Sequence, residues 1–171
     1  MRTTLRSRLL PLTPLVLLAL TPHALRAKTI YVPIDEPTIQ AAINFASNGD
    51  TVLVAPGTYY ENINFMGKAI TVTSSGGPAV TTINGGARGT VVMFITNEGR
   101  NSVLSGFTIT NGNSYYNNQN LGILDYEGGG IYVNSASPTI TNNVITANVA
   151  CGDGAGIAAL VLLFVNAMTY N

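Results

Sequence analysis

The sequence has 171 residues, enough for one domain, with 46% hydrophobic and 9% charged residues and a formal net charge of +0. This hydrophobic content without net charge excludes a disordered chain. Glycine and asparagine number 18 each, and both tolerate the left-handed backbone of tight corners. The composition therefore favours many short strands joined by turns over a helical enzyme domain.

Residues 1–27 are predicted to be a secretory signal peptide. Arg2, Arg6 and Arg8 form a basic start, Leu9 to Leu20 is an apolar run, and the small residue Ala27 ends the tail. The run is too short for a membrane anchor and contains two prolines. We expect a secreted, periplasmic or cell-surface protein with no membrane span in the mature chain.

Removal of this segment leaves four basic residues against eight acidic ones, a net charge of −4. A negative surface does not attract nucleic acid. It also disfavours an anionic polysaccharide unless a cation bridges the two. The single cysteine, Cys151, cannot form an internal disulfide, and we expect it to be a small buried residue.

Residues 28–50 are predicted to form an N-terminal strand (28–34) and a capping helix. Asp35-Glu36-Pro37 provides ordinary helix-start residues, and Asn48-Gly49 ends the segment. Its apolar residues recur on one helical face, at Ile39, Ala42, Ile43 and Ala46. The first coil of a solenoid would otherwise expose its core and its strand edges, so this helix is expected to cover them.

Residues 51–157 are predicted to form stacked coils. Short apolar strands alternate with corners of Gly, Asn, Ser and Pro, and Gly130-Ile131 reappears 26 residues later as Gly156-Ile157. A fixed period with this content indicates a parallel β-solenoid, here of about four to five coils. The strands are expected at 51–55, 61–65, 69–73, 81–84, 91–95, 103–104, 107–110, 131–133, 139–141 and 144–145. The first inward-facing candidates are Ile63, Phe65, Ile70 and Val72.

Two further spacings are interpreted as coil repeats. Ile70-x-Val72 recurs as Val92-x-Phe94 after 22 residues, and LSGFTIT (104–110) aligns with ITNNVIT (140–146) after 36. The second spacing exceeds 26, and the excess is assigned to residues 111–127. Insertions in repeat proteins form loops, often on a binding face. The corner asparagines are predicted to satisfy backbone groups of neighbouring coils; these are Asn111, Asn142, Asn143 and Asn148.

Residues 158–171 interrupt the pattern, because Ala158 to Val165 is continuously apolar and too short to span a membrane. We expect either an apolar terminal strand or the end of a truncated or frameshifted piece of a longer protein, and prefer the second interpretation.

Three stretches carry a family resemblance: TIQAAINFASNGDTVLVAPGTYYENINF (38–65), KAITVTSS (68–75) and TTINGG (81–86). They resemble the N-terminal part of right-handed parallel β-helix proteins of the pectate-lyase-like superfamily. The resemblance implies an all-β, right-handed parallel β-helix with a short N-terminal capping α-helix, and its coil phrases resemble secreted bacterial proteins.

The opening is also similar to pectin methylesterases, but their aspartate motifs QDTLY and DFIFG do not occur here, so that activity is not inferred. The GGGI and GAGI phrases resemble repeats of chlamydial surface adhesins.

The candidate site residues lie in the 111–127 loop. Tyr115, Tyr116 and Tyr126 could stack on sugar rings or instead hold the loop against the barrel. Asp125 and Glu127 could bind Ca²⁺ or act as acid and base on a glycosidic bond, or simply form a solvated loop edge.

Tyr59 and Tyr60 are expected to pack near the cap. No spacing of Cys and His indicates a metal site, and Ca²⁺ is the one cofactor considered.

We predict a secreted or cell-surface carbohydrate-binding module, the N-terminal portion of a larger protein, whose partner is a polysaccharide or surface glycan. The first alternative is a polysaccharide lyase or glycoside hydrolase, and the second is a structural or adhesin-like segment. No catalytic residue can be assigned from the sequence.

Overall fold

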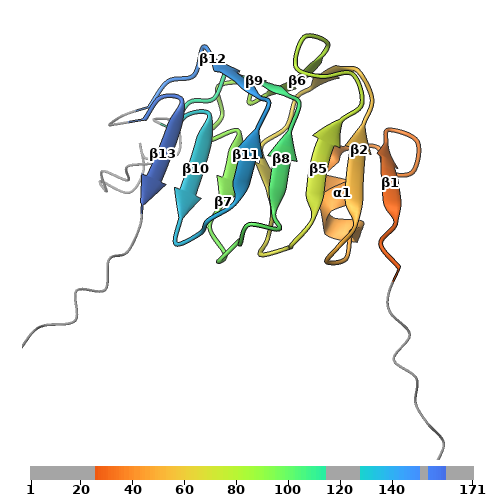
Figure 1. Ribbon diagram of the computed structural model, residues 1–171. Helices are drawn as coiled ribbons and strands as arrows, with labels where there is room; N and C mark the ends of the chain where they lie inside the picture. Colours follow the sequence, from red (N-terminus) through yellow and green to blue (C-terminus); the bar gives the residue numbers. More distant parts are fainter. Residues whose placement is uncertain (1–25, 115–127, 151–153, 161–171) are drawn as a thin grey trace, which may run out of the picture.

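The computed structural model describes residues 26–114, 128–150 and 154–160. Within them the chain forms three parallel sheets and one short helix, which Figure 1 shows as a single rod of stacked coils. The predicted signal peptide up to residue 25, loop residues 115–127, Cys151 and residues 161–171 lie outside the described residues.

From β2 onward, successive strands of the chain belong to sheet A, sheet B and sheet C in turn. Sheet A has the order β1-β2-β5-β8-β11, sheet B the order β12-β9-β6-β3 and sheet C the order β13-β10-β7-β4. The strands are β1 (Thr29–Val32), β2 (Thr51–Val54), β3 (Gly57–Tyr59), β4 (Ile63–Asn64), β5 (Thr71–Ser74), β6 (Thr81–Asn84), β7 (Val92–Phe94), β8 (Val103–Ser105), β9 (Thr108–Thr110), β10 (Ile131–Asn134), β11 (Thr139–Thr141), β12 (Val144–Thr146) and β13 (Ile157–Leu160).

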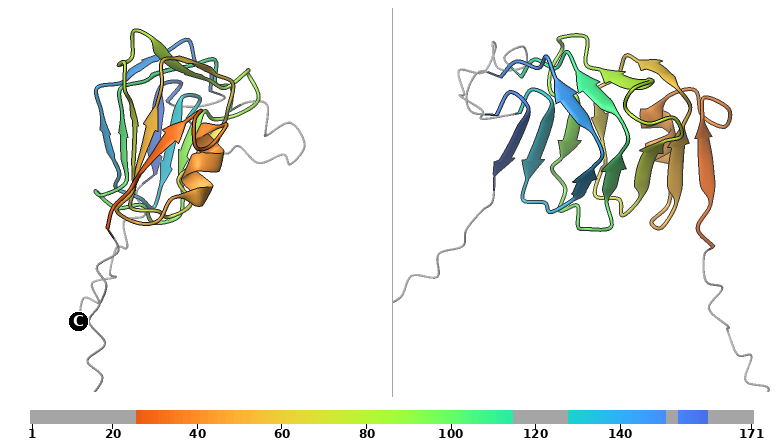
Figure 2. Two further views of the ribbon diagram at one scale, coloured as in Figure 1. Left: turned by 90° about the vertical axis from the view of Figure 1, so that its right-hand side faces the viewer. Right: turned by 45° about the horizontal axis from the view of Figure 1, so that its top comes forward.

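The coil is right-handed. Followed from β1 in Figure 1, the chain runs up sheet A in front, passes back along sheet B at the top and descends through sheet C behind, while advancing to the left. Figure 2 (right) brings sheet B forward. The predicted all-β, right-handed parallel β-helix with a capping helix is therefore confirmed.

Inward side chains stack in rows along the axis of the coil. Ile63, Val92 and Ile131 are in register across sheet C, and none of the three is exposed. The Phe65 and Phe94 rings of the same sheet stack with their centroids 4.3 Å apart. All four predicted inward candidates, Ile63, Phe65, Ile70 and Val72, are at most 1% exposed. The period-two alternation thus identified the core correctly.

Two of the three predicted repeat spacings match the strand registers. Ile131 pairs with Ile157, and Leu104 pairs with Ile140. The 22-residue spacing is wrong, because Val72 belongs to sheet A whereas Val92 belongs to sheet C and pairs with Ile63. Corners differ in length, so similar phrases in different sheets can lie almost one coil apart in sequence.

Strand β3 was not expected. The predicted strands end at residue 55 and resume at residue 61, but β3 begins at Gly57, where φ is 157°. The strand pairs with β6 through Gly57 and Thr81. A glycine before two polar or aromatic residues carries no apolar alternation, so the sequence pattern could not reveal this strand.

The helix α1 (Ile39–Phe45) lies at the β1 end of the coil, on the side formed by sheet C (Figure 2, left), and contacts β1, β2 and β4. Its apolar residues Ile39, Ala42 and Ile43 are fully buried. It begins two residues after the predicted Pro37, because the Thr38 hydroxyl caps it by accepting from the Ala41 N–H at 3.0 Å.

Two charged side chains bind the ends of α1. Both Glu61 carboxylate oxygens accept hydrogen bonds of 2.9 Å, one from the Ile39 N–H and one from the Gln40 N–H. At the other end the Lys68 ammonium donates to three carbonyl oxygens at 2.7, 2.7 and 2.8 Å, those of Ile43, Asn44 and Ala46. An acid at the start of a helix and a base at its end both oppose the helix dipole favourably.

Gln40 closes the exposed edge of sheet C. Its amide oxygen accepts from the Asn64 N–H at 2.7 Å, and its amide nitrogen donates to the Asn64 carbonyl at 3.2 Å. The side chain therefore replaces the backbone of the strand that would otherwise pair with β4. An edge satisfied in this way does not template pairing with another chain.

No helix among the described residues is long and apolar enough to cross a membrane.

Candidate functional site

The candidate residues from the sequence, Tyr115, Tyr116, Tyr126, Asp125 and Glu127, lie outside the described residues, and their roles stay predictions. The chain on either side of their loop is placed. The segment that contains these residues follows β9 of sheet B and precedes β10 of sheet C, so it is part of a connection between these two sheets.

The two ends of that loop are tied to the coils. The Ser114 N–H donates to the Val149 carbonyl at 3.1 Å, and the Gly128 carbonyl accepts from the Thr90 hydroxyl at 2.7 Å.

A hollow of about 220 Å³ lies at the same kind of corner nearer the cap. We call it the polar corner, and its lining residues are Tyr60, Asn62, Asn84, Gly85, Gly86 and Arg88. They come from the end of β6 and from two successive connections between sheet B and sheet C, the first between β3 and β4 and the second between β6 and β7.

Alternation of the extended chain after β3 presents Tyr60 to solvent. Tyr59 packs against the core, and its hydroxyl donates to the Ala55 carbonyl at 2.9 Å. The next ring, Tyr60, is 76% exposed, so the prediction that it packs near the cap is wrong. Adjacent residues of an extended chain point to opposite sides, and only one of the two tyrosines can face the core.

The floor of the polar corner is a glycine turn held to the next coil. The Gly85 N–H donates to the Thr110 carbonyl at 2.9 Å, and the Ala87 N–H donates to the Asn111 carbonyl at 2.7 Å. A Cβ atom on Gly85 would approach a Val91 methyl to 2.9 Å and the Asn111 carbonyl oxygen to 3.0 Å. The close contact between coils therefore requires glycine here.

The two amides of the polar corner are oriented by the backbone around them. The Asn84 oxygen accepts from the Gly86 N–H at 2.9 Å and from the Asn111 amide at 3.0 Å. The Asn62 nitrogen donates to the Thr90 carbonyl at 2.9 Å. Within the described chain, the Asn84 nitrogen, the Asn62 oxygen and the Arg88 guanidinium keep hydrogen-bonding capacity for a ligand.

The charge at the polar corner is set by Arg88, the only charged residue among its described lining residues. Glu61 lies between Tyr60 and Asn62 in sequence, but its carboxylate is turned to the helix α1. Burial, followed by the nearby Glu61 charge, raises the pKa of Tyr59, so this phenol stays neutral and hydrogen-bonded.

Two other hollows are lined in part by polar groups that hold the fold together. One of about 500 Å³ lies beside α1, where the Gln40 side chain is bound to the Asn64 backbone and Lys68 to the helix carbonyls. Another, of about 490 Å³, lies at the start of sheet A and includes Asp50. The polar corner is therefore the better candidate for a ligand site.

The two buried carboxylates of the described chain both hold backbone rather than a reacting group. Asp50 accepts at 2.9 Å from the Lys28 N–H and at 2.9 Å from the Ser47 N–H, and these bonds, the Lys28 one first, lower its pKa. Glu98 accepts at 2.8 Å from both the Gly67 and the Thr96 N–H. Because both carboxylates accept from backbone N–H groups, each has a structural role.

Two of the four corner asparagines, Asn143 and Asn148, bind backbone groups of the neighbouring coil as predicted, and Asn111 binds a side-chain amide instead. Asn143 accepts from the Phe107 N–H at 2.9 Å and donates to the Leu104 carbonyl at 3.0 Å, and Asn148 repeats this bridge one corner later. Asn111 binds the Asn84 amide of the preceding coil. The prediction is wrong for Asn142, whose amide makes no hydrogen bond within the described residues and which instead supplies a left-handed corner, with φ of 54°.

Among the described residues no group of three or more His, Cys, Asp or Glu side chains could hold a metal ion. The predicted Ca²⁺ ligands Asp125 and Glu127 lie outside this part of the chain.

The fold and the polar corner define a parallel β-helix protein with a ligand-sized hollow at one edge. A family model described as "Protein of unknown function (DUF1565)" matches residues 64–171, which is more than half of the chain. The chain belongs to this family. The match begins in β4 and includes the later coils. No curated protein and no solved structure matches the chain.

Proposed function

We propose that this chain is a carbohydrate-binding β-helix module, acting outside the cell or at its surface, and that the polar corner is part of its binding site. The observation that carries the proposal is the exposed Tyr60 ring, which lies beside amide and guanidinium groups with unused hydrogen-bonding capacity in one hollow. Export rests on the predicted signal peptide in residues 1–27.

The chemistry of the polar corner suits a sugar. A pyranose ring offers an apolar face of C–H groups, which packs on an aromatic ring, and a rim of hydroxyls. Asn62 can accept from such hydroxyls, and Asn84 and Arg88 can donate to them. Because neighbouring backbone already orients both amides, binding costs little side-chain entropy there.

The position of the polar corner supports the earlier loop hypothesis. Tyr115 and Tyr116 follow the equivalent corner of the next coil, between β9 and β10. We also propose that the chain is a distant member of the pectate-lyase-like superfamily, supported by its right-handed coil of three parallel sheets and its helical cap.

The test is retention of the purified chain by a panel of immobilised or gel-embedded soluble polysaccharides. For the polymer that binds, Tyr60→Ala and Arg88→Met are each expected to weaken retention about 5- to 10-fold, since a lost stacking or charged contact costs about 1 kcal/mol. Val80→Ala is the matched control, because Val80 is 52% exposed at a different corner, between β5 and β6.

Retention unchanged by both variants would exclude the polar corner as the site. Absence of retention across the panel would overturn the carbohydrate proposal in favour of a structural segment. Release of shortened or unsaturated products would instead support a lyase or hydrolase.

A further inference from the structure

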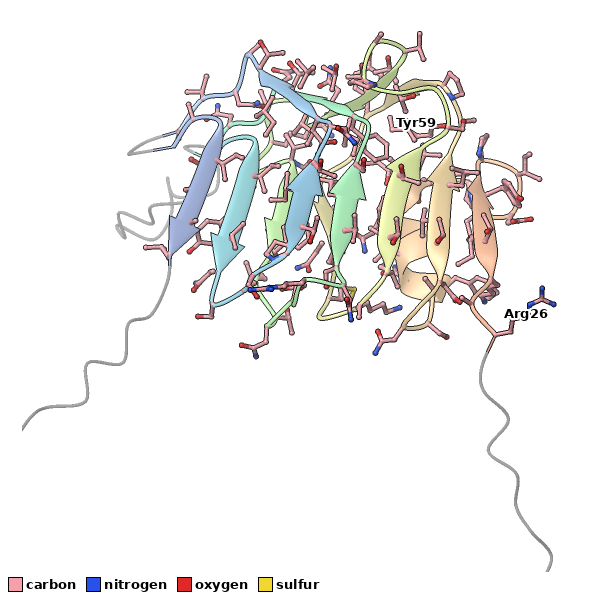
Figure 3. All side chains as sticks on the ribbon, in the orientation of Figure 1. Arg26 and Tyr59 are labelled. Atoms are coloured by element: carbon pink, nitrogen blue, oxygen red, sulfur yellow. The ribbon has the colours of Figure 1, made fainter. Side chains whose placement is uncertain are left out.

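The outer surface of sheet A is a regular array of hydroxyl groups, which we call the hydroxyl face. Strand registers align its outward residues in two rows. The first row is Thr29, Thr51, Thr71, Val103 and Thr139, and the second is Tyr31, Leu53, Thr73, Ser105 and Thr141. All except Leu53 and Val103 carry a hydroxyl. This face is turned toward the viewer in Figure 3.

No strand of sheet A contains a charged residue. The nearest charges lie at the strand ends and at the β1 edge. Lys28 precedes β1, Asp50 precedes β2 and Arg100 lies before β8. The Asp35 carboxylate accepts from the Tyr31 N–H at 2.8 Å. Arg26, labelled in Figure 3, projects away beyond the start of β1. Soluble sheet proteins usually place charges on exposed strands to prevent association. An uncharged face of this extent therefore suits an uncharged ligand.

The hydroxyls of this face are almost all unused. Thr139 donates to the Arg100 carbonyl at 2.8 Å. Within the described residues, the other hydroxyls of the two rows make no hydrogen bond. Each remains both a donor and an acceptor for a ligand.

The spacing of the array favours a rigid, periodic partner. Neighbouring strands are about 4.8 Å apart, and alternate residues of one strand about 6.6 Å apart, so the hydroxyls form a regular grid, in which Thr71 and Val103 also line the hollow at the start of sheet A. One such hydrogen bond contributes little net free energy by itself. A rigid ligand can make many of these contacts after losing its translational freedom once, whereas a flexible soluble chain must be ordered for each of them.

We propose that the hydroxyl face binds the ordered surface of an insoluble, uncharged polysaccharide. This inference takes its ligand class from the proposed carbohydrate function, but it uses another surface and other residues than the polar corner. Neutral polysaccharide fibres present their own repeating hydroxyls, which complement an uncharged donor–acceptor grid. A protein partner would be expected to use clustered aromatic or arginine anchors, and this face has one aromatic residue, Tyr31 on β1.

The test is partition of the full chain onto microcrystalline cellulose and onto chitin powder. The wild-type chain should bind at least one solid, and soluble oligosaccharides of the same sugar should not displace it. Thr71→Lys, near the centre of the face, should reduce binding about 10-fold, because the ammonium group must lose water against a neutral surface. Thr71→Val, which removes only the hydroxyl, should reduce binding about 2-fold.

Thr146→Lys is the matched control, because it adds the same charge at an exposed strand position of sheet B. It should leave solid binding unchanged. Circular dichroism and a urea melt show whether each variant folds, and Thr71→Val keeps the test valid if the lysine variant does not.

The two proposals separate in the same assay. Tyr60→Ala should lose soluble-polymer retention and keep solid binding, whereas Thr71→Lys should do the reverse. Absence of binding to both solids, an equal loss in Thr146→Lys, or full displacement by soluble oligosaccharides would overturn the hydroxyl-face proposal. A dimer in sedimentation that Thr71→Lys converts to a monomer would assign the face to a second copy of this chain instead.

Discussion

The two ends of the described coil differ in how completely their inward-facing residues are buried, as one row of sheet C shows. Ile63, Val92 and Ile131 are in register and completely buried, whereas Ile157, the next residue of the same row, is 44% exposed. Ile157 lies on β13, the last described strand of sheet C. An inward position in a solenoid is thus buried only when a further layer covers it.

The opposite end of the coil has such a layer in α1. Ile30 in β1 is only 2% exposed although β1 is the edge strand of sheet A, and α1 contacts that strand. Polar contacts also hold the cap in place. Glu61 and Lys68 bind the backbone of α1, and the Gln40 side chain of α1 binds the edge of sheet C. At this end of the coil, a helix bound by polar side chains therefore covers the apolar row.

The largest effect on stability is expected from shortening a buried side chain of this row, and the matched change at an exposed position of the row should cost much less. Ile131→Ala should lower the free energy of unfolding by about 2–5 kcal/mol, because it leaves a cavity in a closed core. Ile157→Ala should cost less than about 1 kcal/mol, because much of that side chain already contacts water. Urea denaturation of both variants measures the difference, and equal costs would contradict the comparison.

Releasing the cap should have the next largest effect. Lys68→Met removes the donor to three helix carbonyls and should destabilise the chain by about 1.5–3 kcal/mol, the usual range for hydrogen bonds to a charged group. Hydrogen exchange should then speed up in β1 and β2, which α1 contacts. Arg88→Met is the charge-matched control and should leave stability and exchange unchanged. Unaltered exchange in the Lys68 variant would show that apolar packing alone holds α1.

The smallest effect is expected in acid, at Asp50. Its folded-state pKa lies below the ordinary value of 3.8, so the carboxylate contributes stability that is fully present above that pH. This contribution is lost as the pH falls below 3.8 through the folded-state pKa. Urea denaturation at several pH values should show a shallower acid loss for Asp50→Asn than for the parent.

Glu36→Gln provides the control for that titration, because no hydrogen bond or ion pair of its side chain is present within the described residues. Its pH profile should follow the parent. A parent and an Asp50→Asn profile of the same shape would contradict a role for this carboxylate in acid stability.

The candidate site was less predictable than the coil. Tyr60 and Arg88 are separated by 28 positions in sequence, and their common hollow depends on how two corners of different length stack. The roles of Glu61 and Lys68 were missed for the same reason, since each binds helix residues more than 20 positions away. Residues 57–62 (GTYYEN) contain a signal, because Glu61 follows two tyrosines, but this local pattern does not indicate which backbone groups the acid binds.

The amino-acid sequence alone determined which residues face the core and that the strands stack in parallel. Alternation and repetition are local properties that a linear pattern records directly. Only the tertiary structure decided that β5 and β7 belong to different sheets and that Tyr60 is exposed. It also decided which side chains bind α1 and which residues form the hydroxyl face. Each of these depends on which residue the next coil brings alongside, and the variable corners set that pairing in space.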